Sequence, residues 1–301
     1  MSIGSRLTQV LRDAHVISIN DQSRLVLFSD CHRGDGGAAD DFAPNKAIYL
    51  AALRHYDQQR YIYIELGDGD ELWENSSFNA VARAHPQVFA QLQRFHADGR
   101  FYLLYGNHDI ERESMDIVRR TLWRYLEPQT QTDHPLFDGL TVYEGLRLRY
   151  EQPGQPSAEL FLTHGHQGDW LNDRLWREGR FLVRYLWRPL QWLGIKDPTR
   201  TSKNLKKQAK VISGVLTWIK DNQQPIIVGH THTESFASED ELPYFNTGSC
   251  IYPDCITAIE IENGALSFVR WQENKDDAGN SAFTRVVEAG PRAMASLGSG
   301  V

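Results

Sequence analysis

The 301-residue sequence is poor in cysteine, and its few cysteines form no recognisable pattern. Cys31, Cys250 and Cys255 are odd in number, and none belongs to a C-x-x-C pair. This excludes a disulfide framework and a thiolate zinc site, and it is typical of a reducing compartment. The net charge of −7 argues against a protein that coats nucleic acid, so nucleic acid is not an expected partner.

Long apolar runs are also missing. The stretch 1–16 lacks an apolar core of signal-peptide length. The stretch 181–195 is rich in apolar and aromatic residues, but Arg184, Arg188 and Pro189 interrupt it, and it is too short to cross a bilayer. We therefore expect a cytoplasmic protein, with peripheral contact at the inner face of the membrane as the one form of membrane association.

Short apolar runs alternate with helical patterns over most of the chain. This alternation predicts an α/β fold with a largely parallel sheet. Helical patterns cover 44–59, 79–98 and 203–222. Strands are expected at 24–30, 61–68, 100–109, 158–166 and 225–232. Because each of these strands ends in Asp or His, the pattern indicates one composite site at the carboxyl ends of the strands.

Five short blocks follow or end these strands and combine Asp, Asn and His: SDCH (29–32), GDGDE (67–71), GNHD (106–109), THGH (163–166) and GHTH (229–232). This mixture suits borderline divalent metals such as Mn, Fe, Zn or Co. Asp30 and His32 are two residues apart, a spacing that aims both side chains to one side of an extended chain. Cys31, between them, is then expected to be a small core residue.

The order of these blocks, D-x-H, G-D, G-N-H-D, H and G-H-x-H, resembles the calcineurin-like metallophosphoesterases. The resemblance implies a four-layer sandwich of two packed mixed β-sheets flanked by helices. It also implies two divalent metal ions, with Mn as first choice and Fe, Zn or Co as alternatives. His108 is then the catalytic residue that faces the substrate phosphate, oriented by Asp109. The implied ligands are Asp30, His32 and His232 for one metal, Asn107, His164 and His230 for the other, and Asp68 as the bridge.

The chemistry expected from such a site is hydrolysis of a phosphoester or pyrophosphate by a hydroxide that bridges the metals. No G-x-S-x-G motif offers a protein nucleophile. A nucleotide-linked or lipid-linked diphosphate is the first substrate hypothesis, and a phosphomonoester or cyclic nucleotide is the alternative. A metal-poor scaffold with the same fold is a hypothesis of another class. The complete ligand set argues against it, because a scaffold would tolerate the loss of ligands.

The segment 170–210 is strongly basic and holds four of the eight tryptophans. It carries eleven Lys or Arg against three Asp or Glu, a local balance of +8 within a chain of −7. Its arginines recur at helical spacing, and three interpretations stay open: a solvated helix face, a lid or membrane-surface contact for an anionic amphiphile, and a nucleic-acid contact. The candidate substrate-binding residues are Arg33, Arg177, Arg180 and Arg184, although a surface salt bridge is an equal alternative for Arg33.

The block GDGDELW (67–73), followed later by this basic insertion, is similar to the UDP-2,3-diacylglucosamine pyrophosphohydrolases, which tend to carry Glu where Glu71 stands. Many members have Arg where His108 stands. The similarity therefore suggests a related subfamily but does not assign a substrate. His166 has no place in the motif, which favours a structural or supporting role. We expect one domain over 1–272 with a helical cap insertion over the site at 170–222, and a loose tail at 273–301.

Overall fold

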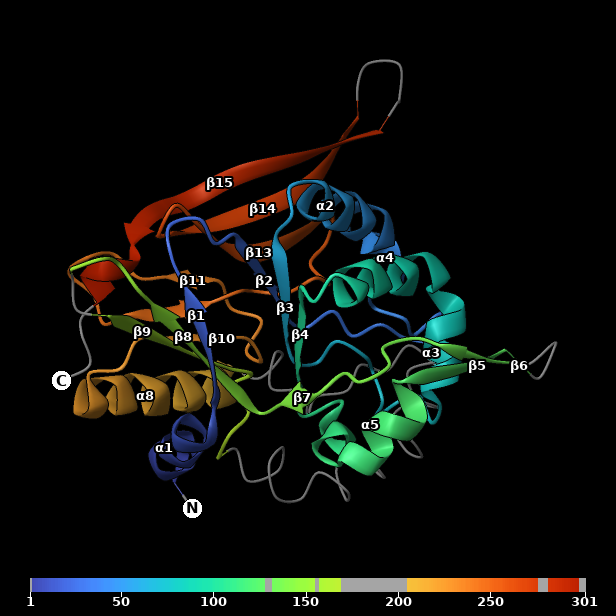
Figure 1. The fold of residues 1–301 in the computed structure, drawn as a ribbon, viewed down its shortest axis with the longest axis horizontal. Helices are drawn as coiled ribbons and strands as arrows, with labels where there is room; N and C mark the ends of the chain where they lie inside the picture. Colours follow the sequence, from blue (N-terminus) through green and yellow to red (C-terminus); the bar gives the residue numbers. More distant parts are fainter. Residues whose placement is uncertain (1, 128–131, 155–156, 169–204, 276–280, 298–301) are drawn as a thin grey trace.

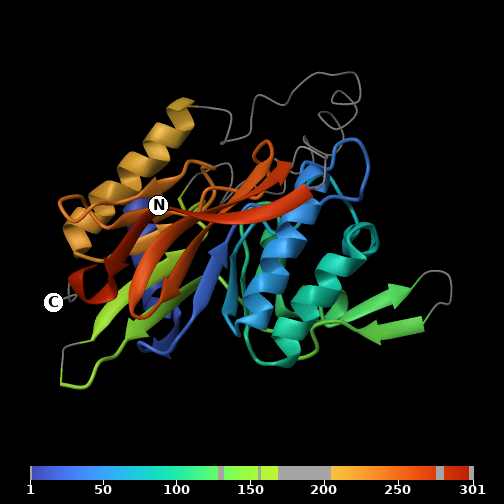
Figure 2. The ribbon, with the colours of Figure 1, turned by 90° about the horizontal axis from the view of Figure 1, so that it is seen from above.

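The computed structural model describes residues 2–127, 132–154, 157–168, 205–275 and 281–297. Two β-sheets pack face to face, and helices cover the outer face of each sheet (Figures 1 and 2). This arrangement confirms the predicted four-layer sandwich. No helix among the described residues is long and apolar enough to span a membrane.

The first sheet has six strands in the described part of the chain, in the order β1-β8-β9-β10-β12-β11. It is mixed, because β8 and β9 are antiparallel whereas β9, β10 and β12 run parallel. Its strands are β1 (His15–Ile19), β8 (Gly145–Tyr150), β9 (Ala158–Thr163), β10 (Ile226–Val228), β11 (Ser235–Phe236) and β12 (Tyr244–Asn246).

The second sheet has seven strands in the described residues, in the order β15-β14-β13-β2-β3-β4-β7. Its middle strands β2, β3 and β4 are parallel, and their near-continuous apolar sequences are typical of strands buried on both faces. The strands are β2 (Leu25–Phe28), β3 (Ile62–Leu66), β4 (Phe101–Leu104), β7 (Val142–Tyr143), β13 (Cys255–Glu262), β14 (Ala265–Lys275) and β15 (Ser281–Ala293).

Three apolar clusters hold these layers together. The central cluster lies between the sheets and includes Leu27 and Leu162, one from each sheet. The helices α2 (Lys46–Gln58) and α4 (Pro86–Ala97) pack on the second sheet, and α1 (Ile3–Asp13) and α8 (Leu205–Asn222) pack on the first. The apolar face of α8 is a helical repeat of buried residues, Val211, Val215, Trp218 and Ile219.

The remaining elements connect the layers or extend beyond them. Two of them, β5 and β6, form a separate two-stranded hairpin that projects from the sandwich (Figure 1). The bounds are α3 (Phe78–Ala84), α5 (Met115–Thr121), β5 (Arg124–Glu127), β6 (Thr132–Pro135) and the 3-10 turns η1 (Ala43–Asn45), η2 (Ile110–Glu113) and η6 (Met294–Leu297).

The structure corrects three expectations about the ends of these elements. Residues 281–297 are not a loose tail, because 281–293 form β15 and pair with β14 along its length. Residues 205–222 are not part of a cap, because α8 is an outer layer of the sandwich. The pair Glu144-Gly145 has a turn-type sequence that predicts a hairpin, but it instead carries the chain from β7 in one sheet to β8 in the other. The rest of the predicted insertion, 170–204, lies outside the described residues.

The pair Asn263-Gly264, a sequence that predicts a two-residue hairpin turn, does form one, between β13 and β14. Both residues have positive φ, 52° and 69°, as a two-residue turn between antiparallel strands requires. The helical pattern at 79–98 is divided into α3 and α4 at His85, because Pro86 cannot continue a helix and instead begins the next one.

Candidate metal centre

The five blocks converge at the edge where the two sheets meet. Asp30, Asp68 and Asn107 follow β2, β3 and β4 of one sheet, and His164 and His230 follow β9 and β10 of the other. Backbone hydrogen bonds continue past the ends of the strands, from Asp30 N to Gly67 O at 3.1 Å and from Gly229 N to His164 O at 2.9 Å. The metal-ligand candidates therefore sit on backbone held by the sheets themselves.

Five of the candidate residues adopt left-handed backbone conformations that side-chain-bearing residues rarely adopt. Their φ angles are 52° for Asp30, 47° for His32, 50° for Asp68, 65° for His230 and 51° for His232. The expectation that Asp30 and His32 share a side because the chain is extended is therefore wrong: the turns themselves bring the side chains together. Such conformations cost about 1–3 kcal/mol each and cluster at functional sites.

Glycine is required where these turns approach one another. Gly67 has a φ of 88°, and a Cβ at this position would lie 2.7 Å from Gly106 N and 2.8 Å from His164 Cγ. A Cβ on Gly106 would in turn lie 2.6 Å from Asp68 N. The glycines that precede the ligand-type residues thus allow the backbones of β3 and β4 to meet beneath the site.

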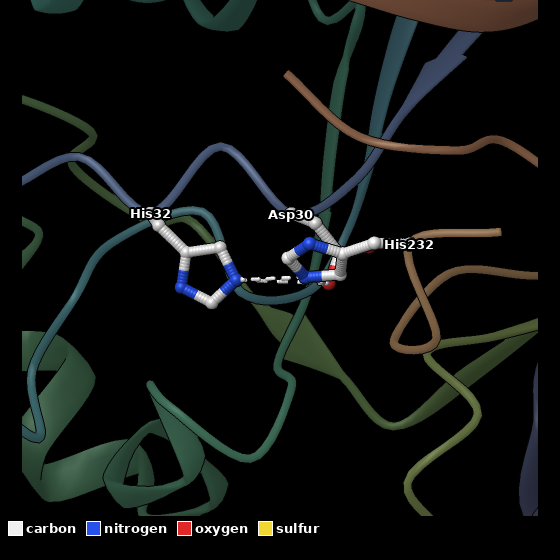
Figure 3. A group of neighbouring side chains, drawn as sticks. All are labelled: Asp30, His32 and His232. Atoms are coloured by element: carbon white, nitrogen blue, oxygen red, sulfur yellow. Dashed lines mark hydrogen bonds and ion pairs between the residues drawn. The ribbon is translucent and has the colours of Figure 1, made fainter. Parts of the chain in front are cut away.

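One group of side chains, Asp30, His32 and His232, faces a common point (Figure 3). Asp30 Oδ1 lies 3.0 Å from His232 Nε2 and 3.8 Å from His32 Nε2. The two imidazole nitrogens are 3.2 Å apart. Asp30 Oδ2 is oriented by the backbone N–H of His230, which donates to it at 2.9 Å, and by the hydroxyl of Ser29.

A second group is formed by Asp68, His164 and His230, all buried. Asp68 Oδ2 lies 3.1 Å from His164 Nε2 and 3.8 Å from His32 Nε2, so this carboxylate stands between the two groups. Its other oxygen accepts the backbone N–H of His108 at 2.8 Å. Asp68 is thus placed where a residue shared by two ions would be.

The donor atoms of these groups fit divalent metal ions. Among the candidate metal ligands, four buried atoms have no hydrogen-bond partner in the described part of the chain: Asp30 Oδ1, Asn107 Oδ1, His164 Nε2 and His230 Nε2. Buried polar atoms are rarely left unpaired unless a ligand takes them up. His164 Nδ1 donates to Leu66 O at 2.7 Å, which leaves Nε2 free to act as a neutral ligand atom.

The charges around the site are arranged for cations. Burial disfavours the charged form of His164, but the carboxylates of Asp68 and Asp30 outweigh this effect and raise its pKa to about 9. Burial and the neighbouring charge of His164 lower the pKa of His230 to about 3. Burial would raise the pKa of Asp30, yet the nearby histidines hold it well below its usual value. In the absence of metal, a proton on His164 therefore offsets part of the charge of the buried carboxylates.

Comparison with known proteins identifies the family. The family model described as calcineurin-like phosphoesterase matches residues 23–234. The chain belongs to the calcineurin-like phosphoesterase family. It is accordingly a hydrolase that acts on phosphoester bonds with divalent metal ions, as the order of the five blocks predicts. No curated protein matches the sequence closely enough to be counted as a relative.

Two solved structures are similar to this phosphoesterase at low identity. One is Vps29 from Chaetomium thermophilum, with a TM-score of 0.35 and 10% identity, covering 89% of this chain and 96% of that chain. The other is a protein described as a 5'-nucleotidase from Staphylococcus aureus, in complex with alpha-ketoglutarate. It has a TM-score of 0.33 and 12% identity and covers 87% of this chain and 52% of that chain.

His108 of this phosphoesterase lies at the rim of the site, where a third group contains His32, Glu71 and His108. The carboxylate of Glu71 lies 2.8 Å from His108 Nδ1 and 3.0 Å from His32 Nδ1. Asp109 does not orient His108, contrary to expectation, because its carboxylate accepts Gly106 N–H at 2.6 Å and Arg112 at 2.9 Å. The sequence pattern gave no indication that Glu71 would hold His108.

Trp73 was also missed as a residue of the site. Its indole stacks on the imidazole of His108, with ring centroids 4.7 Å apart and an angle of 22°. The indole Nε1 donates to Asn107 O at 2.5 Å, so the same side chain holds the backbone of a candidate ligand. The signal available in the sequence was only its place in the block GDGDELW, two residues after Glu71.

Arg33 does not contact the substrate side of the site, and it is not a surface residue. Its side chain is buried, and its guanidinium pairs with Glu65 and Asp70 at 2.7 Å each. The carboxylates are the reason for the burial, since a buried cation requires charged partners. Arg177, Arg180 and Arg184, the other candidate substrate-binding residues, lie outside the described residues.

Proposed function

We propose that this phosphoesterase uses two manganese ions to hydrolyse a nucleotide-linked or lipid-linked diphosphate. The observation that carries the proposal is the pair of side-chain groups that share Asp68 between them, with His108 at their rim. Asp30, His32 and His232 would hold one ion, Asn107, His164 and His230 the other, and Asp68 both. When bound, two such ions lower the pKa of water and polarise phosphoryl oxygens.

The residues around the ions have separate tasks in this proposal. His108 presents its Nε2 to the reacting phosphate, because Glu71 takes up Nδ1 and Trp73 covers one face of the ring. From that position it can stabilise the developing charge or protonate the leaving oxygen. The donor set contains only nitrogen and oxygen atoms, which is compatible with Mn and keeps Fe, Zn and Co as alternatives.

The substrate class rests on the basic segment 170–210, whose balance of +8 would suit a substrate with several negative charges. Its tryptophans and leucines would suit a bulky or apolar group attached to the diphosphate, including one presented at a membrane surface. The same segment offers a phosphomonoester no comparable advantage, because a single phosphate is already held at the metals.

A hydrolysis screen with added Mn tests both the metal-dependent activity and the choice of a diphosphate substrate. It compares a phosphomonoester, a phosphodiester, a nucleoside diphosphate conjugate and a lipid-linked diphosphate on the purified protein. We expect the highest kcat/KM on a diphosphate substrate. A higher kcat/KM on the phosphomonoester or the phosphodiester would contradict the proposal that the substrate is a diphosphate. No hydrolysis, together with no bound metal, would instead support a metal-poor scaffold.

A further inference from the structure

His166 has an unusual environment for a buried imidazole. Its side chain is 1% exposed, and neither Nδ1 nor Nε2 has a hydrogen-bond partner within the described part of the chain. Buried histidines normally pair at least one ring nitrogen, because an unpaired buried polar group is unfavourable. The metal-ligand assignment does not use His166, so a separate explanation is needed.

The position of His166 places it beside the second metal group. Its ring centroid is 5.5 Å from that of His164 and 6.3 Å from that of His230, whereas those two rings are 5.3 Å apart. His166 nevertheless belongs to none of the groups of closely spaced ligand atoms found among the described residues. It is therefore adjacent to the second group without being one of its ligand candidates, so an oxygen atom held at that group would lie near its ring.

The loop that carries His166 is held without using its ring nitrogens. Gly165, with a φ of 104°, separates it from His164, and Gly165 N donates to Gln167 Oε1 at 2.9 Å. Gln167 is itself buried and donates to Glu144 at 3.4 Å, and Arg6 pairs with Glu144 at 2.6 Å. This frame fixes the loop at the edge of the site and leaves both ring nitrogens available.

We propose that His166 donates a hydrogen bond to a phosphoryl oxygen of the substrate on the His164–His230 side of the site. The inference rests on the proposed phosphoesterase function and adds a binding residue to it. A phosphoryl oxygen can only accept hydrogen bonds, and an imidazole offers one N–H for it. The other ring nitrogen then accepts from a substrate hydroxyl or from water. His166 thus binds the phosphate beside the group that contains His164 and His230, and His108 binds it beside the group that contains His32.

The test uses His166→Leu, which keeps the approximate volume and removes both nitrogens. Inorganic phosphate is the probe, and its binding to the Mn-loaded protein is measured by calorimetry, so the test does not depend on turnover. We expect two bound metal ions, as in the wild type, and a phosphate Kd raised roughly tenfold or more, the range for a lost hydrogen bond to a charged group. His166→Gln should recover part of this loss, because it restores a donor.

A second measurement separates binding from structure. In the metal-free protein, His166→Leu should raise Tm by roughly 2–4 °C, because the unpaired polar atoms are gone. His55→Leu, on α2, is the control and should leave phosphate binding unchanged. An unchanged phosphate Kd in His166→Leu would overturn the proposal, and so would loss of a metal ion, which would make His166 a ligand. If His166→Leu does not fold, the same two outcomes in His166→Met, which also lacks a donor, decide.

The proposed function and this inference can fail separately. Absence of hydrolysis by the wild type would count against the function alone, since phosphate binding is measured directly. A wild type that hydrolyses its substrate while His166→Leu binds phosphate as tightly as the wild type would overturn the inference and leave the function intact.

Discussion

The carboxylate of Glu71 lies 2.8 Å from Nδ1 of His108. The same carboxylate is 3.0 Å from Nδ1 of His32, so one buried side chain orients a candidate metal ligand and a candidate catalytic residue together. Groups that fix the far nitrogen of a ligand histidine control its orientation and its tautomer. Glu71 therefore links the geometry of the metal site to that of the residue that meets the substrate.

Glu71→Gln should lower kcat by roughly 10–100-fold at saturating Mn, the usual effect of removing such an orienting group. An amide has one carbonyl oxygen to accept from two imidazoles, so one histidine loses its acceptor. Steady-state kinetics at several Mn concentrations measure the effect. The matched control is Glu113→Gln, an exposed carboxylate in η2, which should change little. Full activity of Glu71→Gln would show that the contacts of Glu71 with His108 and His32 do not contribute to catalysis.

His108→Ala should leave two metal ions bound and lower turnover by roughly 10²–10⁴-fold, the scale for a general acid or a charge-stabilising group. The reason is that its Nδ1 is taken up by Glu71 and its ring is stacked on Trp73, while the candidate ligands are other residues. Elemental analysis and kcat are measured on the same preparation. If the variant loses metal, the separation between ligand and catalyst is wrong.

Asp68→Ala should cost more activity than any other single ligand substitution, because this carboxylate stands between the two groups and would bind both ions. We expect the loss to exceed roughly 10³-fold, the upper range for one charge-stabilising donor. Metal content should fall below that of His232→Ala, which would affect one ion. A smaller loss in Asp68→Ala than in His232→Ala would contradict a bridging role.

The strands and the site blocks could be predicted because buried strands appear as apolar runs, and the metal-ligand residue types stand next to these runs and not within them. Leu25 to Phe28 is a continuous apolar run, and the next residues are those a metal requires. The backbone conformation of the site could not be predicted, because Asp30 and His32, with their left-handed φ, form backbone hydrogen bonds to the turn that follows β3. The sequence therefore predicts which residues meet but not how the turns bring them together.

Other errors have a common cause in partners distant in sequence. Arg33 is buried because Glu65 and Asp70, more than thirty positions away, neutralise it. The apolar residues of β15 do not alternate with polar ones, and Val286 and Val287 are exposed, so no apolar alternation indicated the strand. It forms an edge strand through backbone pairing with β14, which a pattern of side chains does not reveal.

The raised pKa of His164 gives a prediction about pH. In the folded metal-free protein this pKa is about 9, above the unfolded value near 6.5, so protonation of His164 stabilises the fold. That stability is fully present below about pH 6.5 and is lost as the pH rises through about 9. Tm measured in chelator should therefore fall between pH 6.5 and 9.5. His164→Gln should flatten this part of the curve, and an equally steep fall in the variant would exclude His164 as its source.

The last prediction concerns Arg177, Arg180 and Arg184, which lie outside the described residues but within the basic segment. Changing all three to Gln should raise KM for a large diphosphate substrate and leave a small artificial phosphoester almost unaffected, because the metals and His108 remain. The control is Arg54, Arg119 and Arg120 changed to Gln, three exposed arginines whose loss alters the net charge equally.

A rise in KM in both triple variants would indicate only a general charge effect, and equal losses on both substrates would assign the segment to the fold. If neither substrate responds, the arginines form a solvated face, since exposed charges contribute little individually. Only a rise in KM confined to the large substrate and to the first variant supports a substrate-binding segment, and with it the choice of a bulky diphosphate.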